Sequence, residues 1–88
     1  MKSHKFIISG KVQGVYYRVS VRTNALKSNF NGYVKNLNDG RVEACVTCDD
    51  SKLNEFIKIL NEGSTASRVT NIQELECNNI YSNKFEVR

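Results

Sequence analysis

Gly10-Lys11-Val12-Gln13-Gly14-Val15-Tyr16-Tyr17-Arg18 is the stretch that decides the fold of this chain. An apolar run at residues 6–8 precedes it, and residues 19–28, which follow it, contain no Gly or Pro. The first pattern is typical of a buried strand and the second is compatible with a helix. The fold is therefore expected to begin with a strand joined to a helix by this loop.

The two glycines of the stretch suit it to binding an anion. Glycine adopts positive φ at little cost and leaves backbone N–H groups uncovered, so consecutive amides can converge on one point. Arg18 stands where the helix begins, which adds a guanidinium and the positive end of the helix dipole. A tetrahedral oxyanion such as phosphate fits this arrangement, although many glycine pairs at this spacing only turn a corner.

The first half of the chain reads as strand, helix, strand, turn and strand. We expect the first strand at 5–11 and the helix at 18–28, with Asn29 supplying the left-handed exit. Strands at 32–37 and 41–47 flank Asn38-Asp39-Gly40, whose Asp-Gly pair predicts a type I′ turn. The alternation in the second of these strands predicts one covered and one open face, the open one carrying Arg41, Glu43, Cys45 and Thr47.

The second half adds a helix and two strands. A capping cluster at 49–51 precedes an amphipathic helix that ends at Gly63. A strand at 68–77 follows, and residues 84–88 form a short final strand. The apolar positions of the helix are Leu53, Phe56, Ile57 and Leu60, and those of the long strand are Val69 and Ile72.

The order β-α-β-β-α-β, with a short last strand, predicts an α+β, ferredoxin-like split βαβ sandwich. We expect one domain over residues 1–88, with a mostly antiparallel sheet and two helices on one face. If the third strand lies between the first two, those two run parallel and their carboxyl ends share one edge, roughly 10 Å apart. The loop, Arg18 and the end of the second strand would then be neighbours.

Composition narrows the class of protein. The chain has 88 residues, a net charge of +4 and 40% hydrophobic residues, which is ordinary globular usage. No apolar run approaches the roughly 20 residues that cross a bilayer, so we expect a soluble, cytoplasmic protein with no membrane contact. The basic balance, with a pI near 9.1, suits an anionic partner.

Three cysteines, Cys45, Cys48 and Cys77, argue against a disulfide framework because the number is odd and no secretion signal is present. Cys45-x2-Cys48 matches half of a zinc site, but a second pair is missing. On a strand the two thiols would also point to opposite faces. We therefore expect no metal.

Asn36 is the second candidate site residue. Asparagine is depleted in strands because its amide competes for backbone hydrogen bonds, and Asn36 falls late in the second strand. It could simply begin the following turn. On the edge shared with Arg18, however, its amide could hold a water beside a bound phosphoryl group.

Taken together, these motifs resemble the acylphosphatase family. The resemblance rests on Gly10-x-Val12-Gln13-Gly14-Val15-x-Tyr17-Arg18 and on Gly32-Tyr33-Val34-x-Asn36-x2-Asp39-Gly40-x-Val42-Glu43. It extends to Phe85-x-Val87-Arg88 and so covers nearly the whole chain.

The resemblance implies a ferredoxin-like enzyme that hydrolyses a small acyl phosphate to a carboxylate and inorganic phosphate, without metal or cofactor. By position, Arg18 and the backbone amides would bind the phosphate, and Asn36 would orient the attacking water. The amides concerned are those of Gln13, Gly14, Val15, Tyr16, Tyr17 and Arg18. We expect a monomer.

Departures from the family pattern avoid both working side chains. Tyr17 stands in place of a usual Phe, Tyr33 in place of a frequent Trp, and Asn29 in place of a frequent Gly. The sequence offers no obvious general acid, since His4 is expected to be a surface residue before the first strand. An acyl phosphate has an activated leaving group, and its own phosphate could take the proton of the water; this is a hypothesis.

Two alternatives remain open at this point. The same element order occurs in RNA-binding domains, which need aromatic residues on the third strand, and residues 41–47 have none. We therefore expect no nucleic-acid partner. A non-catalytic phosphate-binding or regulatory domain would keep the fold, but would have no need of both Arg18 and Asn36.

Overall fold

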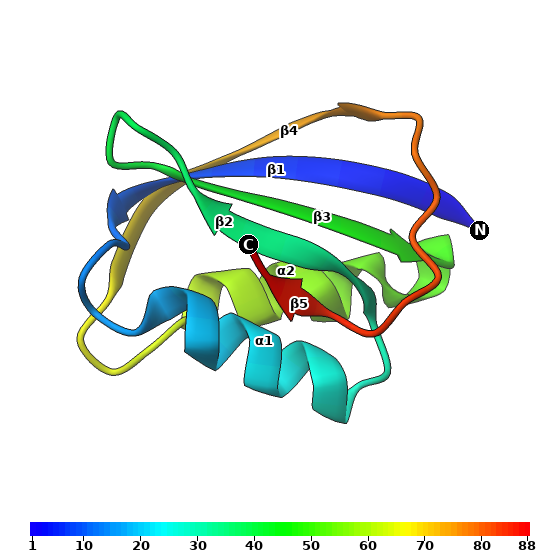
Figure 1. Cartoon of the computed structure of the whole chain (residues 1–88), viewed down its shortest axis with the longest axis horizontal. Coiled ribbons are helices and arrows are strands. Elements are labelled where there is room, and N and C mark those ends of the chain that lie inside the picture. Colours follow the sequence, from blue (N-terminus) through cyan, green and yellow to red (C-terminus); the bar gives the residue numbers. More distant parts are fainter.

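The computed structural model describes residues 1–88 and contains two α-helices against a five-stranded sheet (Figure 1). Helix α1 (Tyr17–Lys27) is followed by Ser28 and then by Asn29, which has the predicted left-handed conformation (φ 61°). The capping cluster forms a short 3-10 turn, and no side chain of the cluster caps it. The elements in chain order are β1 (Lys2–Lys11), α1 (Tyr17–Lys27), β2 (Asn31–Asn36), β3 (Val42–Cys48), η1 (Asp50–Lys52), α2 (Leu53–Glu62), β4 (Arg68–Cys77) and β5 (Glu86–Val87).

The sheet has the order β4-β1-β3-β2-β5, so β3 lies between β1 and β2 as predicted. Every pairing is antiparallel except that of β2 with β5. Strands β1 and β2 both pair antiparallel with β3, so they run in the same direction. Their carboxyl ends therefore share one edge of the sheet.

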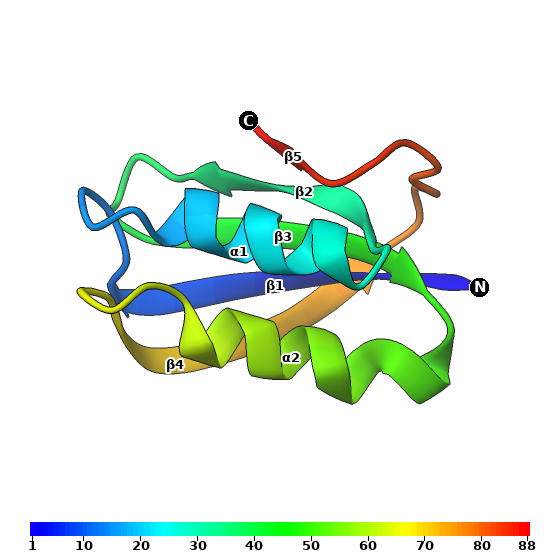
Figure 2. The ribbon, with the colours of Figure 1, turned by 90° about the horizontal axis from the view of Figure 1, so that it is seen from below.

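Both helices lie along one face of the sheet, which gives the two-layer, ferredoxin-like α+β fold (Figures 1 and 2). Side chains alternate between the two faces of a strand, so every second residue faces the helices. The residues that do so are Phe6 and Ile8 of β1 and Val42, Ala44 and Val46 of β3. They form one continuous core with Val21 and Ala25 of α1, Phe56 and Leu60 of α2, and Phe85 before β5.

The opposite face of β3 is less open than predicted. Cys45 is fully buried and Thr47 is 4% exposed. The segment between β4 and β5 crosses this face, and the main-chain N–H of Tyr81 donates a 2.8 Å hydrogen bond to the Thr47 hydroxyl. A contact between residues so far apart in sequence leaves no trace in the local alternation of β3.

The turn between β2 and β3 also differs from the type I′ turn predicted. Gly40 has positive φ (94°), but Asp39 does not. The Gly40 N–H donates to the Leu37 oxygen, and the Leu37 N–H donates to the Arg41 oxygen at 2.8 Å. This is the three-residue loop in which glycine takes the left-handed position after an ordinary turn. The Asp39 carboxylate accepts from the Arg41 N–H and guanidinium, and these bonds lower the pKa of Asp39.

No helix is both long enough and apolar enough to cross a membrane.

Candidate active site

The loop between β1 and α1 contains two left-handed residues, Gly14 (φ 73°) and Tyr16 (φ 62°). A Cβ on Gly14 would have no atom within 4 Å, so space does not require glycine at this position. The positive φ does, because residues with a side chain rarely adopt it. Gly10 has positive φ for another reason: it lies inside β1 at a bulge, where a Cβ would fall 2.1 Å from the Arg68 oxygen. Gly14 is therefore needed for the conformation of the loop, whereas Gly10 is needed for the close approach of β1 to β4.

The side chain of Gln13 ties this loop to the β2–β3 hairpin. Its amide donates to the main-chain oxygens of Leu37 (2.8 Å) and Arg41 (2.9 Å). Leu37 directly follows Asn36, so the bond joins the two predicted halves of the site. The resemblance to the family predicts only a backbone role for Gln13, and the one sequence signal for its side-chain role is a polar residue next to Gly14.

Arg18 and Asn36 line the same cavity, which has a volume of about 370 Å³. Gly14 and Tyr16 of the loop also line it. Arg18 lies in the first turn of α1, whereas Asn36 is the exposed last residue of β2. The fold thus brings the loop, Arg18 and Asn36 to one cavity, as expected from the strand order. The apolar part of the lining comes from Val12, Tyr17 and Val19.

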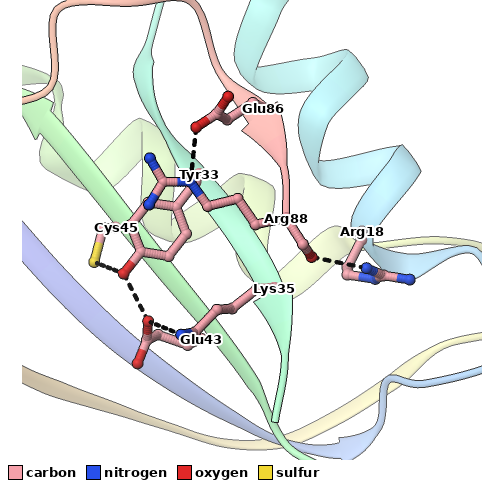
Figure 3. Close-up of polar contacts among 7 residues, drawn as sticks. All are labelled: Arg18, Tyr33, Lys35, Glu43, Cys45, Glu86 and Arg88. Carbon is pink, nitrogen blue, oxygen red and sulfur yellow. Dashed lines mark hydrogen bonds and ion pairs between the residues drawn. The ribbon is translucent and has the colours of Figure 1, made fainter.

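The guanidinium of Arg18 has a partner at the far end of the chain. Its Nη1 donates to the main-chain oxygen of Arg88 at 3.0 Å (Figure 3). Arg88 is held in turn, because its N–H donates to the Val34 oxygen and its guanidinium lies 4.1 Å from the centre of the Tyr33 ring. One end of the guanidinium is fixed by this contact, which restricts the conformations of Arg18.

Tyr17 anchors the loop in the core. Its ring is 1% exposed, and its hydroxyl donates to the Leu60 oxygen of α2 at 2.7 Å. Burial raises the pKa of Tyr17 well above its ordinary value, so the phenol stays protonated and remains a donor. The hydroxyl that departs from the family pattern therefore has a defined partner: a carbonyl of the last helical turn, which lacks a helical donor.

A second buried group supports β2 from the other face of the sheet (Figure 3). The Tyr33 hydroxyl donates to Glu43 Oε2 at 2.6 Å and accepts from the Cys45 thiol at 3.1 Å. Lys35 Nζ lies 3.6 Å from the same Glu43 oxygen. Burial and these neighbours raise the pKa of Tyr33, and burial raises the pKa of Cys45 to about 11. The cluster fixes β2 at Tyr33 and Lys35, three residues and one residue before Asn36.

His4 does not lie where the sequence analysis expected it. It is inside β1, its side chain is 12% exposed, and its Nδ1 lies 2.8 Å from Glu74 Oε2. Asp50 approaches its other ring nitrogen at 3.7 Å. His4 is seven residues from the carboxyl end of β1, roughly 23 Å along the strand, so it is remote from the cavity.

The cysteines are free and lie apart from the cavity. Cys45 and Cys48 are three positions apart on β3, so their side chains point to opposite faces. The chain has no group of three or more His, Cys, Asp or Glu side chains arranged to hold a metal ion.

Comparison with known proteins agrees with this fold. The family model described as Acylphosphatase matches residues 4–87. An acylphosphatase of Methanocella arvoryzae is 39% identical over 88 residues, covering 100% of both chains. Solved structures show the same fold: the crystal structure of the acylphosphatase from Bacillus subtilis has a TM-score of 0.90 at 34% identity, covering 100% of this chain and 99% of that one. An acylphosphatase from Coxiella burnetii has a TM-score of 0.88 at 33% identity, covering 99% and 92%.

The chain therefore belongs to the acylphosphatase family. The resemblance seen in its sequence motifs and the predicted ferredoxin-like fold are both confirmed.

Proposed function

We propose that this chain, an acylphosphatase by family, hydrolyses the carboxyl-phosphate bond of small acyl phosphates without a metal or cofactor. Arg18 and the amides of residues 13–18 bind the phosphoryl group, and Asn36 orients the attacking water. The observation that carries the proposal is the single cavity that Arg18 and Asn36 line together with the glycine loop. Arg22 and the exposed, left-handed Asn29 line another cavity, but that cavity lies toward the carboxyl-terminal end of α1, away from the glycine loop and the first turn of the helix.

The loop provides charge neutralisation. Left-handed residues at 14 and 16 interrupt regular pairing, so the amides around them are not taken up by a strand partner. The first turn of α1 has no acidic residue and no side-chain cap, which leaves its amides to a ligand. Phosphoryl transfer needs positioning and neutralisation above all, and these groups supply both.

Asn36 provides the orientation of the water. Its amide can accept a hydrogen bond from the water and donate one to a phosphoryl oxygen, because it carries both kinds of atom. The water oxygen forms a bond to phosphorus while the bond from phosphorus to the carboxylate oxygen breaks. The carboxylate leaves with the electron pair, and the proton of the water passes to a phosphoryl oxygen. No side chain of the cavity is then required as a general base.

A hydrolysis assay tests the proposal. The purified chain is incubated with benzoyl phosphate, with and without a chelator, and the loss of substrate is followed. Turnover insensitive to the chelator is expected, and Arg18→Ala is expected to lose both turnover and affinity for inorganic phosphate. Binding of phosphate without any turnover would instead identify a non-catalytic phosphate-binding or regulatory domain, the second candidate.

We also propose that the chain acts as a monomer in the cytoplasm. The free thiols of Cys45, Cys48 and Cys77 suit a reducing compartment.

A further inference from the structure

Two large apolar side chains stand exposed at the mouth of the cavity. Tyr16 is 81% exposed and Val19 is 55% exposed. Tyr16 is the residue before α1 and Val19 lies in the first turn of the helix, and both line the same cavity. Tyr16 holds a left-handed φ of 62°, which side chains rarely adopt, and this conformation presents its ring outside the core.

A second hollow begins where the first ends. It also has a volume of about 370 Å³, and Tyr16 and Val19 line both hollows. Its remaining lining comes from Val15 of the loop, from α1 and from the segment after α2, including Thr23, Ser64 and Ala66. The two exposed side chains therefore separate the site of Arg18 and Asn36 from a groove that leads away from it.

The far wall of the groove is fixed. The Ser64 hydroxyl donates to the Val15 oxygen, and the Ser64 N–H donates to the Ser67 hydroxyl at 2.9 Å. Gly63, which precedes this segment, packs so closely on the Tyr17 ring that a Cβ would lie 2.6 Å from it. The groove is therefore built into the fold and needs no rearrangement to form.

The charge of the lining restricts what the groove can bind. All its lining residues are apolar or neutral, with no Asp, Glu, Lys or Arg among them. A charged acyl group placed there would lose water without gaining a counter-charge. An uncharged apolar group would instead cover Tyr16 and Val19, which is favourable in proportion to the apolar area removed from water.

We propose that Tyr16 and Val19 form the subsite for the acyl end of the substrate and select uncharged apolar acyl groups, aromatic or branched aliphatic, over small or charged ones. The inference rests on the proposed function, since it requires the phosphoryl group to lie between Arg18 and Asn36. The acyl group leaves that position through the mouth of the cavity, where these two side chains are.

The test compares kcat/KM for benzoyl, acetyl and 4-carboxybenzoyl phosphate. Because these substrates differ in intrinsic reactivity, the readout is the change in their ratios between variants. Val19→Ser should lower the benzoyl-to-acetyl ratio by about five- to ten-fold, since a partly exposed apolar contact contributes less than a fully buried one. Tyr16→Asn, which tolerates left-handed φ, should shift the ratio in the same direction. The inhibition constant of inorganic phosphate should not move in Val19→Ser.

A second variant makes the charge argument testable. Val19→Lys places a cation in the groove, so it should raise the ratio of 4-carboxybenzoyl to benzoyl phosphate by about ten-fold. Ile80→Ser is the matched control, because Ile80 is also an exposed apolar residue (65%) but lies in the segment between β4 and β5. It should leave every ratio unchanged.

The outcomes separate the two proposals. If Val19→Ser, Tyr16→Asn and Val19→Lys all turn over the substrates with unchanged kcat/KM ratios, the proposed acyl subsite is wrong. The proposed hydrolysis of acyl phosphates would still stand. Absence of turnover with all three substrates would overturn the proposed function, and the subsite with it. Circular dichroism of each variant shows that the fold is kept, as expected for side chains this exposed.

Discussion

The side-chain amide of Gln13 donates a 2.8 Å hydrogen bond to the main-chain oxygen of Leu37, which joins the loop after β1 to the end of β2. A second bond from the same nitrogen reaches the Arg41 oxygen at 2.9 Å. One side chain thus spans the gap between the loop that precedes Arg18 and the strand that carries Asn36. The link therefore helps to set the distance between Arg18 and Asn36, the two side chains proposed to act on the substrate.

Gln13→Ala should therefore reduce both activity and stability. Loss of both bonds is expected to cost about 1–2 kcal/mol of unfolding free energy and to lower kcat/KM by about ten-fold, because a small displacement of positioned groups slows reaction steeply. Urea unfolding and steady-state kinetics measure the two effects. Gln73→Ala, on the exposed surface of β4, is the control. Equal kinetics for both variants would show that the link positions nothing.

Tyr17→Phe tests the buried hydroxyl at the start of α1. Its removal leaves the Leu60 oxygen without the donor at 2.7 Å, while the apolar ring stays in the core. We expect a loss of about 1–2 kcal/mol in unfolding free energy, measured by urea denaturation. A variant as stable as the parent would mean that water or another donor replaces the phenol.

Asn29 tests the exit of α1. Its φ of 61° suits glycine better than any residue with a Cβ. Asn29→Gly should raise the unfolding free energy by a few tenths to about 1 kcal/mol, and Asn29→Ala should lower it by about 1 kcal/mol. Thermal melts of the pair measure the difference. The opposite order would show that the asparagine side chain contributes more than its backbone conformation costs.

Stability should fall in alkaline solution because of buried protonated groups. The pKa of Cys45 rises from its usual 9.0 to about 11, so the unfolded chain releases this proton first. The resulting stability is intact below pH 9 and is lost as pH rises toward 11, by at most about 2–3 kcal/mol. Tyr17 and Tyr33 act in the same direction.

Urea unfolding of the parent and of Cys45→Val between pH 7 and 11 isolates the thiol, since valine fills a similar volume and does not titrate. The variant should lose less stability over this range than the parent. Parallel curves would show that Cys45 does not contribute. Thiol labelling adds a check at neutral pH: Cys77, which is partly exposed, should react before the buried Cys45 and Cys48.

Sequence patterns predicted the bounds of a helix or strand well where the residues of that segment themselves mark its ends. The ends of β4 agree with the prediction at both residues, Arg68 and Cys77, and α2 ends before Gly63 as expected. The start of β1 was missed because Lys2 and Ser3 carry no apolar signal. They extend the strand because they pair with Cys48 and Thr47 of β3, a tertiary contact.

The candidate site also has some features that the sequence predicts and others that depend on tertiary contacts. Residue type and topology sufficed to predict that Arg18 and Asn36 lie close together, and both line one cavity. The hydrogen bonds of the Gln13 side chain and of the Arg18 guanidinium could not be predicted from the sequence. Their acceptors are main-chain oxygens 24 to 70 residues away. Such acceptors are common to every residue, so no sequence pattern distinguishes them.

The central claim is that Arg18 and Asn36 act on one phosphoryl group in different ways, and the most direct measurement is phosphate affinity beside turnover in Asn36→Ala. Calorimetry with inorganic phosphate and kinetics with benzoyl phosphate are run on Asn36→Ala, Arg18→Ala and the parent. Asn36→Ala should bind phosphate within about three-fold of the parent while kcat falls by about 10² or more, whereas Arg18→Ala should lose both. Full turnover in Asn36→Ala, or unchanged phosphate affinity in Arg18→Ala, would contradict the account.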